Sequence, residues 1–101
     1  MELARRIAVV GVGETRYERR SSRDLAALRR EAACAALADA GLEAAAVDGL
    51  IVPGAGYGEL HELARDLGIR GQFHAAWCFH SGTAVVAAPL EAALAIESGL
   101  A

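Results

Sequence analysis

The sequence contains no lysine, few aromatic residues and little cysteine. All ten basic residues are arginine, five residues are aromatic, two are cysteine, and the net charge is −3 over 101 residues. An acidic total with so few rings argues against a nucleic-acid-binding protein, which needs a basic surface and stacking groups. Two cysteines favour reduced intracellular thiols over a disulfide framework, so a cytoplasmic protein is expected.

Metal ligands and long apolar runs are also scarce. Three scattered histidines and two cysteines do not form the paired clusters of about four ligands that structural zinc needs, so neither a metal nor another cofactor is expected. The apolar run at residues 7–12 is too short for a signal peptide or a membrane span. We therefore expect no membrane association.

The charge is unevenly distributed along the chain. Residues 1–30 carry +4, whereas residues 31–101 carry −7. The basic part includes four arginines just before a predicted helix, where the helix dipole disfavours cations: Arg16, Arg19, Arg20 and Arg23. We interpret them as solvated or partner-binding groups, with a phosphate ligand as the alternative.

Hydrophobic periodicity predicts three strand–helix units. Strands are predicted at 7–12, 47–52 and 72–78. Helices are predicted from a capping-box-like start at Ser21 and Asp24 to Ala40, from Glu59 to Leu67, and over 82–98 with a bend or a start at Pro89. The order β-α-β-α-β-α predicts an α/β fold, a mostly parallel sheet with helices packed on it, in one domain over 1–101.

Two features qualify this fold. Three strands rarely suffice to cover such apolar strands on both faces, so we expect a truncated, N-terminal part of a larger domain. The Gly11-x-Gly13 pair is similar to a dinucleotide fingerprint, but Arg16 occupies the third glycine position and no helix follows directly. A tight turn at the strand end is the better interpretation, and a small nucleotide-binding protein is the weaker alternative.

The stretch AAWCFHSG at 75–82 is the candidate reaction centre. A strand, a sharp turn and a helix that opens with Ser81 and Gly82 match the general geometry of a nucleophile elbow. Amides at a helix N-terminus lower a thiol pKa and stabilise an oxyanion, so Cys78 and His80 are candidate catalytic residues. The alternative is that Cys78 is a packed small residue. Cys34, among alanines in a predicted helix, is interpreted as packed, and His61 as exposed.

Four stretches together resemble the N-terminal part of thiolase-fold proteins, especially the sterol-carrier or lipid-transfer type often labelled acetyl-CoA acetyltransferases. They are IAVVGVGETRY at 7–17, LADAGLEAAAVDGLIV at 37–52, ELARDLGI at 62–69 and SGTAVVAAPLEAALAIESGLA at 81–101. The resemblance implies two similar α/β halves, and an acyl-CoA thioester as substrate in lipid metabolism. It also implies a homo- or hetero-oligomer, such as a dimer, formed through the strand at 72–78.

The resemblance also places the site. In thiolases the nucleophile belongs to a Cys-x-Ser-Gly pattern, and Phe79 stands at that position here. Cys78 is one residue early, and a slip of one residue turns a side chain to the other face of a strand. His80 therefore becomes the better candidate for a polar role, with Ser81 and Gly82 binding substrate.

The functional prediction is a thiolase-like, acyl-CoA-handling protein. It would act as an acyltransferase or make or break a carbon–carbon bond beside the thioester, and the 101-residue chain alone would be an inactive portion. The alternative from another class is a non-catalytic subunit or scaffold. Such a subunit would dock a partner through the strand at 72–78 and the basic loop at 16–23.

Overall fold

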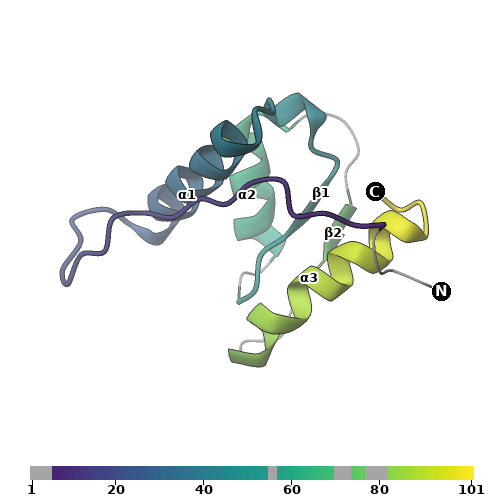
Figure 1. The fold of residues 1–101 in the computed structure, drawn as a ribbon. Coiled ribbons are helices and arrows are strands. Elements are labelled where there is room, and N and C mark those ends of the chain that lie inside the picture. The colour runs from purple at the N-terminus through teal and green to yellow at the C-terminus, as the bar shows by residue number, and fades with distance from the viewer. Residues whose placement is uncertain (1–5, 55–56, 70–73, 77–81) are drawn as a thin grey trace.

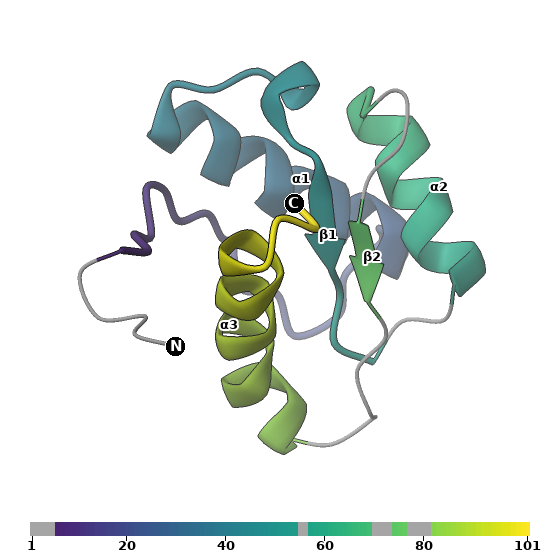
Figure 2. The same cartoon turned by 90° about the vertical axis from the view of Figure 1, so that its right-hand side faces the viewer.

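The computed structural model describes residues 6–54, 57–69, 74–76 and 82–101. Its helices and strands are α1 (Leu25–Ala40), the 3-10 turn η1 (Ala44–Ala46), β1 (Gly49–Ile51), α2 (Tyr57–Leu67), β2 (His74–Ala76) and α3 (Gly82–Glu97). The two strands pair in parallel, with Leu50 opposite Ala75. Helices α1 and α2 lie on one side of this pair and α3 lies on the other (Figures 1 and 2).

Helix α1 confirms the most regular pattern in the sequence, although its N-cap differs from the prediction. The Asp24 carboxylate accepts a hydrogen bond from the Ala27 N–H at 2.8 Å, so Asp24 itself is the cap. Ser21 instead accepts from the Arg23 N–H within the preceding loop. At the other end Gly41 has φ 69°, a left-handed conformation that glycine adopts without a Cβ clash.

The described core is small and centres on α2. Leu60 is only 1% exposed, and Leu63 and Ala64 on the same helix face are also buried. Ile69 adds to this cluster after Gly68 ends the helix at φ 83°. The predicted helix is therefore confirmed, with a start two residues earlier than expected, at Tyr57.

Helix α3 confirms the last predicted helix. Pro89 lies inside it, so the helix does not start at that proline. Helix α3 carries apolar side chains around nearly its whole circumference. Five of the large ones are exposed: Val85, Val86, Leu90, Leu94 and Ile96. A helix that is apolar all round is normally buried in a larger assembly. No described helix is both long enough and apolar enough to cross a membrane.

The strand predicted at 7–12 is wrong for the described structure, which leaves these residues as irregular chain. The segment runs along α1, where the Val12 N–H donates to the Asp39 carboxylate at 2.9 Å. Val9, Val10 and Val12 are exposed by 65% or more. The apolar run therefore packs beside a helix. Its backbone donates a hydrogen bond to a side chain, whereas the predicted strand would have paired with the backbone of a neighbouring strand.

The same segment corrects the interpretation of the glycine pair. Residues 11–13 form no turn in the described structure, and neither Gly11 nor Gly13 has a positive φ that would itself require glycine. A Cβ at Gly11 would meet the Ala36 carbonyl oxygen, and one at Gly13 would meet the backbone of α1 even more closely. The two glycines therefore allow the chain to approach the helix backbone.

This close approach predicts a position-specific loss of stability. Gly13→Ala is expected to lower the free energy of unfolding by about 1–3 kcal/mol, because the added methyl group overpacks against helix backbone that cannot move aside. Gly58→Ala is the matched control, since nothing lies within 4 Å of a Cβ at that helical position. Urea unfolding of both variants measures the difference, and equal stability of the two would contradict the account.

The observed N-cap gives a second prediction. Asp24→Ala should cost about 1 kcal/mol, because it removes the acceptor for the Ala27 N–H. Ser21→Ala should stay within about 0.5 kcal/mol, as usual for surface positions. Thermal unfolding followed by circular dichroism compares them, and a larger loss at Ser21 would restore the original capping prediction.

Candidate functional site

The predicted reaction centre lies mostly outside the described residues. Cys78, Phe79, His80 and Ser81 fall in 77–81, and only Gly82 is described, as the first residue of α3. The described elements on either side are those that the prediction requires, since β2 ends at Ala76 and α3 begins at Gly82. The segment thus connects the carboxyl end of a parallel strand to a helix N-terminus, the edge of an α/β sheet where ligands usually bind.

An apolar cleft of about 430 Å³ lies between β1 and α3. Among the described residues that line it, Asp48 is the only charged one, and the others are small or aliphatic: Val47, Gly49, Leu50, Ile51, Val85, Ala88, Pro89, Ala92, Ala95, Ile96 and Ala101. Apolar walls of this kind bind hydrocarbon, and the described ones supply one carboxylate. The cleft therefore suits an apolar chain or a packed element.

A second cleft of about 300 Å³ separates α1 from α2 and contains several carboxylates. Arg29 from α1 forms an ion pair with Glu59 from α2 across it, and the Arg29 side chain is only 19% exposed. Within the described ranges, no group of three or more His, Cys, Asp or Glu residues is arranged to hold a metal ion. The Arg29–Glu59 ion pair therefore serves to hold the two helices together.

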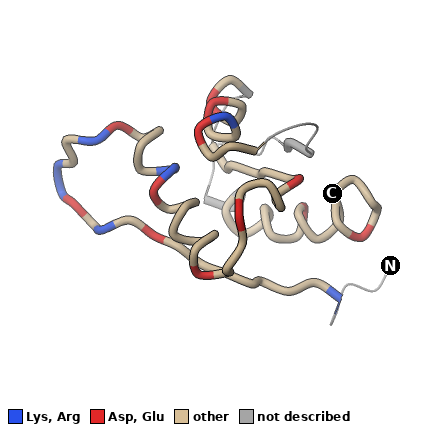
Figure 3. The backbone as a smooth tube through the Cα atoms, turned by 90° about the horizontal axis from the view of Figure 1, so that it is seen from above, with Lys and Arg blue, Asp and Glu red and all other residues tan. Residues whose placement is uncertain are grey.

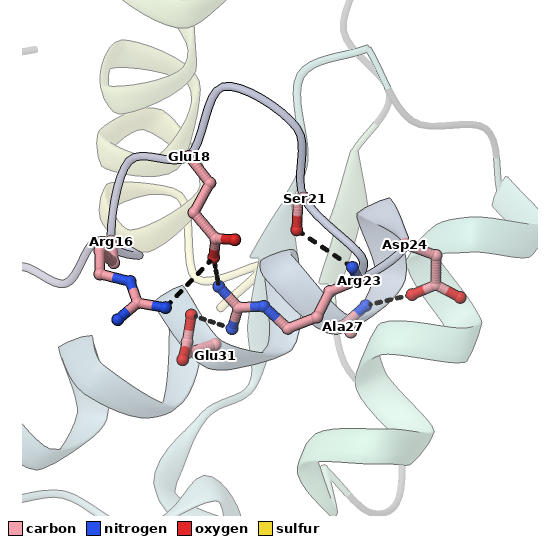
Figure 4. A network of polar contacts seen from close by, with 7 residues as sticks. All are labelled: Arg16, Glu18, Ser21, Arg23, Asp24, Ala27 and Glu31. Carbon is pink, nitrogen blue, oxygen red and sulfur yellow. Dashed lines mark hydrogen bonds and ion pairs between the residues drawn. The ribbon is translucent and has the colours of Figure 1, made fainter.

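The most organised polar cluster lies in the loop before α1 and at the start of that helix (Figure 4). Arg23 contacts Glu18 at 2.8 Å and Glu31 at 2.7 Å, and Glu18 also lies 3.9 Å from Arg16. Hydrogen bonds to Glu31 and then Glu18 raise the pKa of Arg23 above its ordinary value. We name Glu18, Arg23 and Glu31 the loop clamp, because they tie the loop to the first turns of α1.

The clamp leaves other basic groups of the loop unpaired. Arg19 and Arg20 are exposed and have no ion-pair partner in the part of the chain that the structure describes. Tyr17 is 85% exposed, and a hydrogen bond to the Glu14 carboxylate raises the pKa of its hydroxyl. Figure 3 shows the basic residues of this loop gathered at one end of the molecule.

Sequence reasoning placed the arginines in this loop but missed the clamp. The only available signal was the interleaving of Glu18 and Glu31 with Arg23 at short separations, which also occurs on ordinary solvated surfaces. The prediction for Cys34 is wrong, because that thiol is exposed on α1. The exposed position predicted for His61 is confirmed.

Two known proteins are similar to nearly the whole chain. No family model matches the chain. A steroid side-chain-cleaving aldolase from Thermomonospora curvata is 35% identical over 94 residues, which are 93% of this chain and 24% of the relative. A solved structure of an Ltp2-ChsH2(DUF35) aldolase superposes with a TM-score of 0.83 at 36% identity, over 93% of this chain and 25% of that one.

The names of both relatives agree with the predicted making or breaking of a carbon–carbon bond, but neither relative is named a thiolase. The chain spans about a quarter of the length of the relatives it matches. Over that quarter, it is similar in sequence to both aldolases and in fold to the solved one.

Proposed function

We propose that the protein contributes to aldol-type cleavage of a carbon–carbon bond next to an acyl-CoA thioester, with a steroid side chain as the substrate class. The observation that carries the proposal is 35% identity to a steroid side-chain-cleaving aldolase across nearly the whole chain. The finer fold, a thiolase-like α/β domain with oligomer contacts through 72–78, is part of the same proposal. The activity belongs to the complete polypeptide.

The proposed chemistry is a retro-aldol reaction. A base removes the proton of a β-hydroxyl group, the bond between the α and β carbons breaks, and its electrons move into the thioester carbonyl as an enolate. Protonation of the α carbon then gives a shorter acyl thioester and a free carbonyl compound. The reaction needs proton transfer and oxyanion stabilisation, but no covalent intermediate on the enzyme.

This chemistry accounts for the departure from the thiolase pattern. A thiolase forms an acyl-enzyme and needs a thiol at the position of Phe79, whereas a retro-aldol cleavage does not. His80 would transfer a proton, and the amides at Ser81 and Gly82 would face the thioester oxygen at the start of α3. Cys78 would then be a neighbour of the reacting groups without acting as a nucleophile.

The second candidate is a non-catalytic subunit that docks a partner chain. Exposed apolar residues on α3 favour it, since a helix of this composition is normally covered. The same observation fits a catalytic polypeptide whose other segments cover α3. An assay for cleavage separates the two candidates.

The first prediction from this proposal concerns His80. In the complete polypeptide, His80→Ala should lower kcat for cleavage of a β-hydroxyacyl-CoA by about 10²–10⁴-fold, the usual contribution of a proton-transfer group. Cys78→Ala should keep most of the activity, and Cys34→Ala serves as the control at the exposed thiol of α1. Loss of activity with Cys78→Ala alone would indicate a thiol mechanism.

The second prediction concerns the reactivity of Cys78. Exposed Cys34 would dominate any alkylation experiment, so the measurement requires the Cys34→Ser background. Iodoacetamide labelling against pH should then give Cys78 an apparent pKa that is not below the ordinary value of about 8.5. A strongly depressed pKa would instead mark Cys78 as an activated nucleophile.

A further inference from the structure

We infer that the loop at 13–24 docks the protein onto an acidic face of a second, different protein chain. The inference rests on the proposed function, because it names a partner surface for the same aldolase assembly. It goes beyond that proposal in placing the contact in a loop that the cleavage chemistry does not use.

The loop is held in place by its own polar contacts. Its base is fixed where Asp24 caps α1 and where the Ser21 hydroxyl accepts from the Arg23 N–H. The loop clamp ties Glu18 through Arg23 to Glu31 on α1. A loop that is ordered before binding loses less conformational entropy when a partner docks.

The groups that this arrangement leaves exposed are those that interfaces favour. The Arg16 side chain is 85% exposed and touches Glu18 only at 3.9 Å. Arg19 and Arg20 are exposed without partners in the described structure. Tyr17, which follows Arg16 in the sequence, is 85% exposed. Arginine and tyrosine are enriched among the residues that carry binding energy in protein–protein interfaces.

The shape of the loop argues for a protein surface over a small phosphate ligand. The loop projects beyond the end of α1 at the edge of the molecule (Figure 1). Arg16, Arg19 and Arg20 line neither the apolar cleft beside α3 nor the acidic cleft between α1 and α2. Small ligands bind in concave sites that bury most of their surface, whereas a projecting basic loop matches an extended acidic face.

Charge and the comparisons argue for a partner other than a second copy. The acidic cleft is the natural counterpart within this chain, but its Glu59 already pairs with the largely buried Arg29. The solved relative is named for two proteins, Ltp2 and ChsH2(DUF35). A second protein of that kind is therefore the occupant that fits best.

The test measures binding of the complete polypeptide to the ChsH2(DUF35) component of the solved relative, by titration calorimetry at low and high salt. The double variant Arg19→Glu/Arg20→Glu should bind at least about tenfold more weakly, since like charges then face each other across the interface. The control double variant Arg30→Glu/Arg65→Glu makes the same charge change at exposed positions of α1 and α2 and should bind like the wild type. Arg19→Ala/Arg20→Ala provides an intermediate case, and circular dichroism checks that all variants fold.

Four results of the binding experiments with these variants would overturn the inference, and a fifth comes from a titration with coenzyme A. They are no binding of the wild-type chain to the probe, equal binding by the loop variant, equal loss in the control variant, and a loop-dependent self-association without the probe. A loop-dependent affinity for coenzyme A would likewise replace the protein partner with a phosphate. Cleavage by the wild-type polypeptide is assayed separately, so intact cleavage with loop-independent docking refutes only this inference, whereas absent cleavage refutes the proposed function.

Discussion

The packing of residues 11–13 against α1 is the contact on which the rest of the described structure depends. Two glycines bring the chain onto the helix backbone, and Asp39 accepts the Val12 N–H. This contact fixes the point at which the loop at 13–24 leaves the body of the protein. The cap at Asp24 and the loop clamp then fix where the loop returns. The direction of the basic loop is therefore set by backbone packing at one end and by ion pairs at the other.

The weak point of the described structure is its thin apolar core, and this weakness bears on function. Few residues beyond the α2 cluster are buried, while α3 exposes large aliphatic side chains and borders an open apolar cleft. Such a layer gains stability when further apolar surface covers it. The relatives are about four times as long as this chain. The proposed activity is therefore assigned to the whole protein and not to these residues alone. The proposed chemistry at 78–82 would need an imidazole for proton transfer and backbone amides to stabilise the oxyanion.

Helix positions followed from the sequence because their signals are local. Regular apolar spacing, Asp24 before α1, and Gly41 and Gly68 after the helices act within a few residues. The strand at 7–12 could not be decided in this way, because a strand needs partners elsewhere and the segment contacts α1 instead. The role of Gly11 and Gly13 was missed for the same reason, since a close approach to a distant helix leaves no local signature. At the candidate site, the order of strand and helix was predictable, but the choice between thiol and aldol chemistry depends on the comparisons.

The most direct test of the central claim is the fate of the bond and the proton during turnover. The complete polypeptide is incubated in D₂O with a steroid whose side chain is a β-hydroxyacyl-CoA thioester. The products are analysed by mass spectrometry. The account predicts a shorter acyl-CoA with one deuterium at its α carbon, a released carbonyl compound, and no consumption of free coenzyme A. Thiolytic cleavage of a 3-ketoacyl-CoA with consumption of coenzyme A, and no cleavage of the hydroxy substrate, would contradict it.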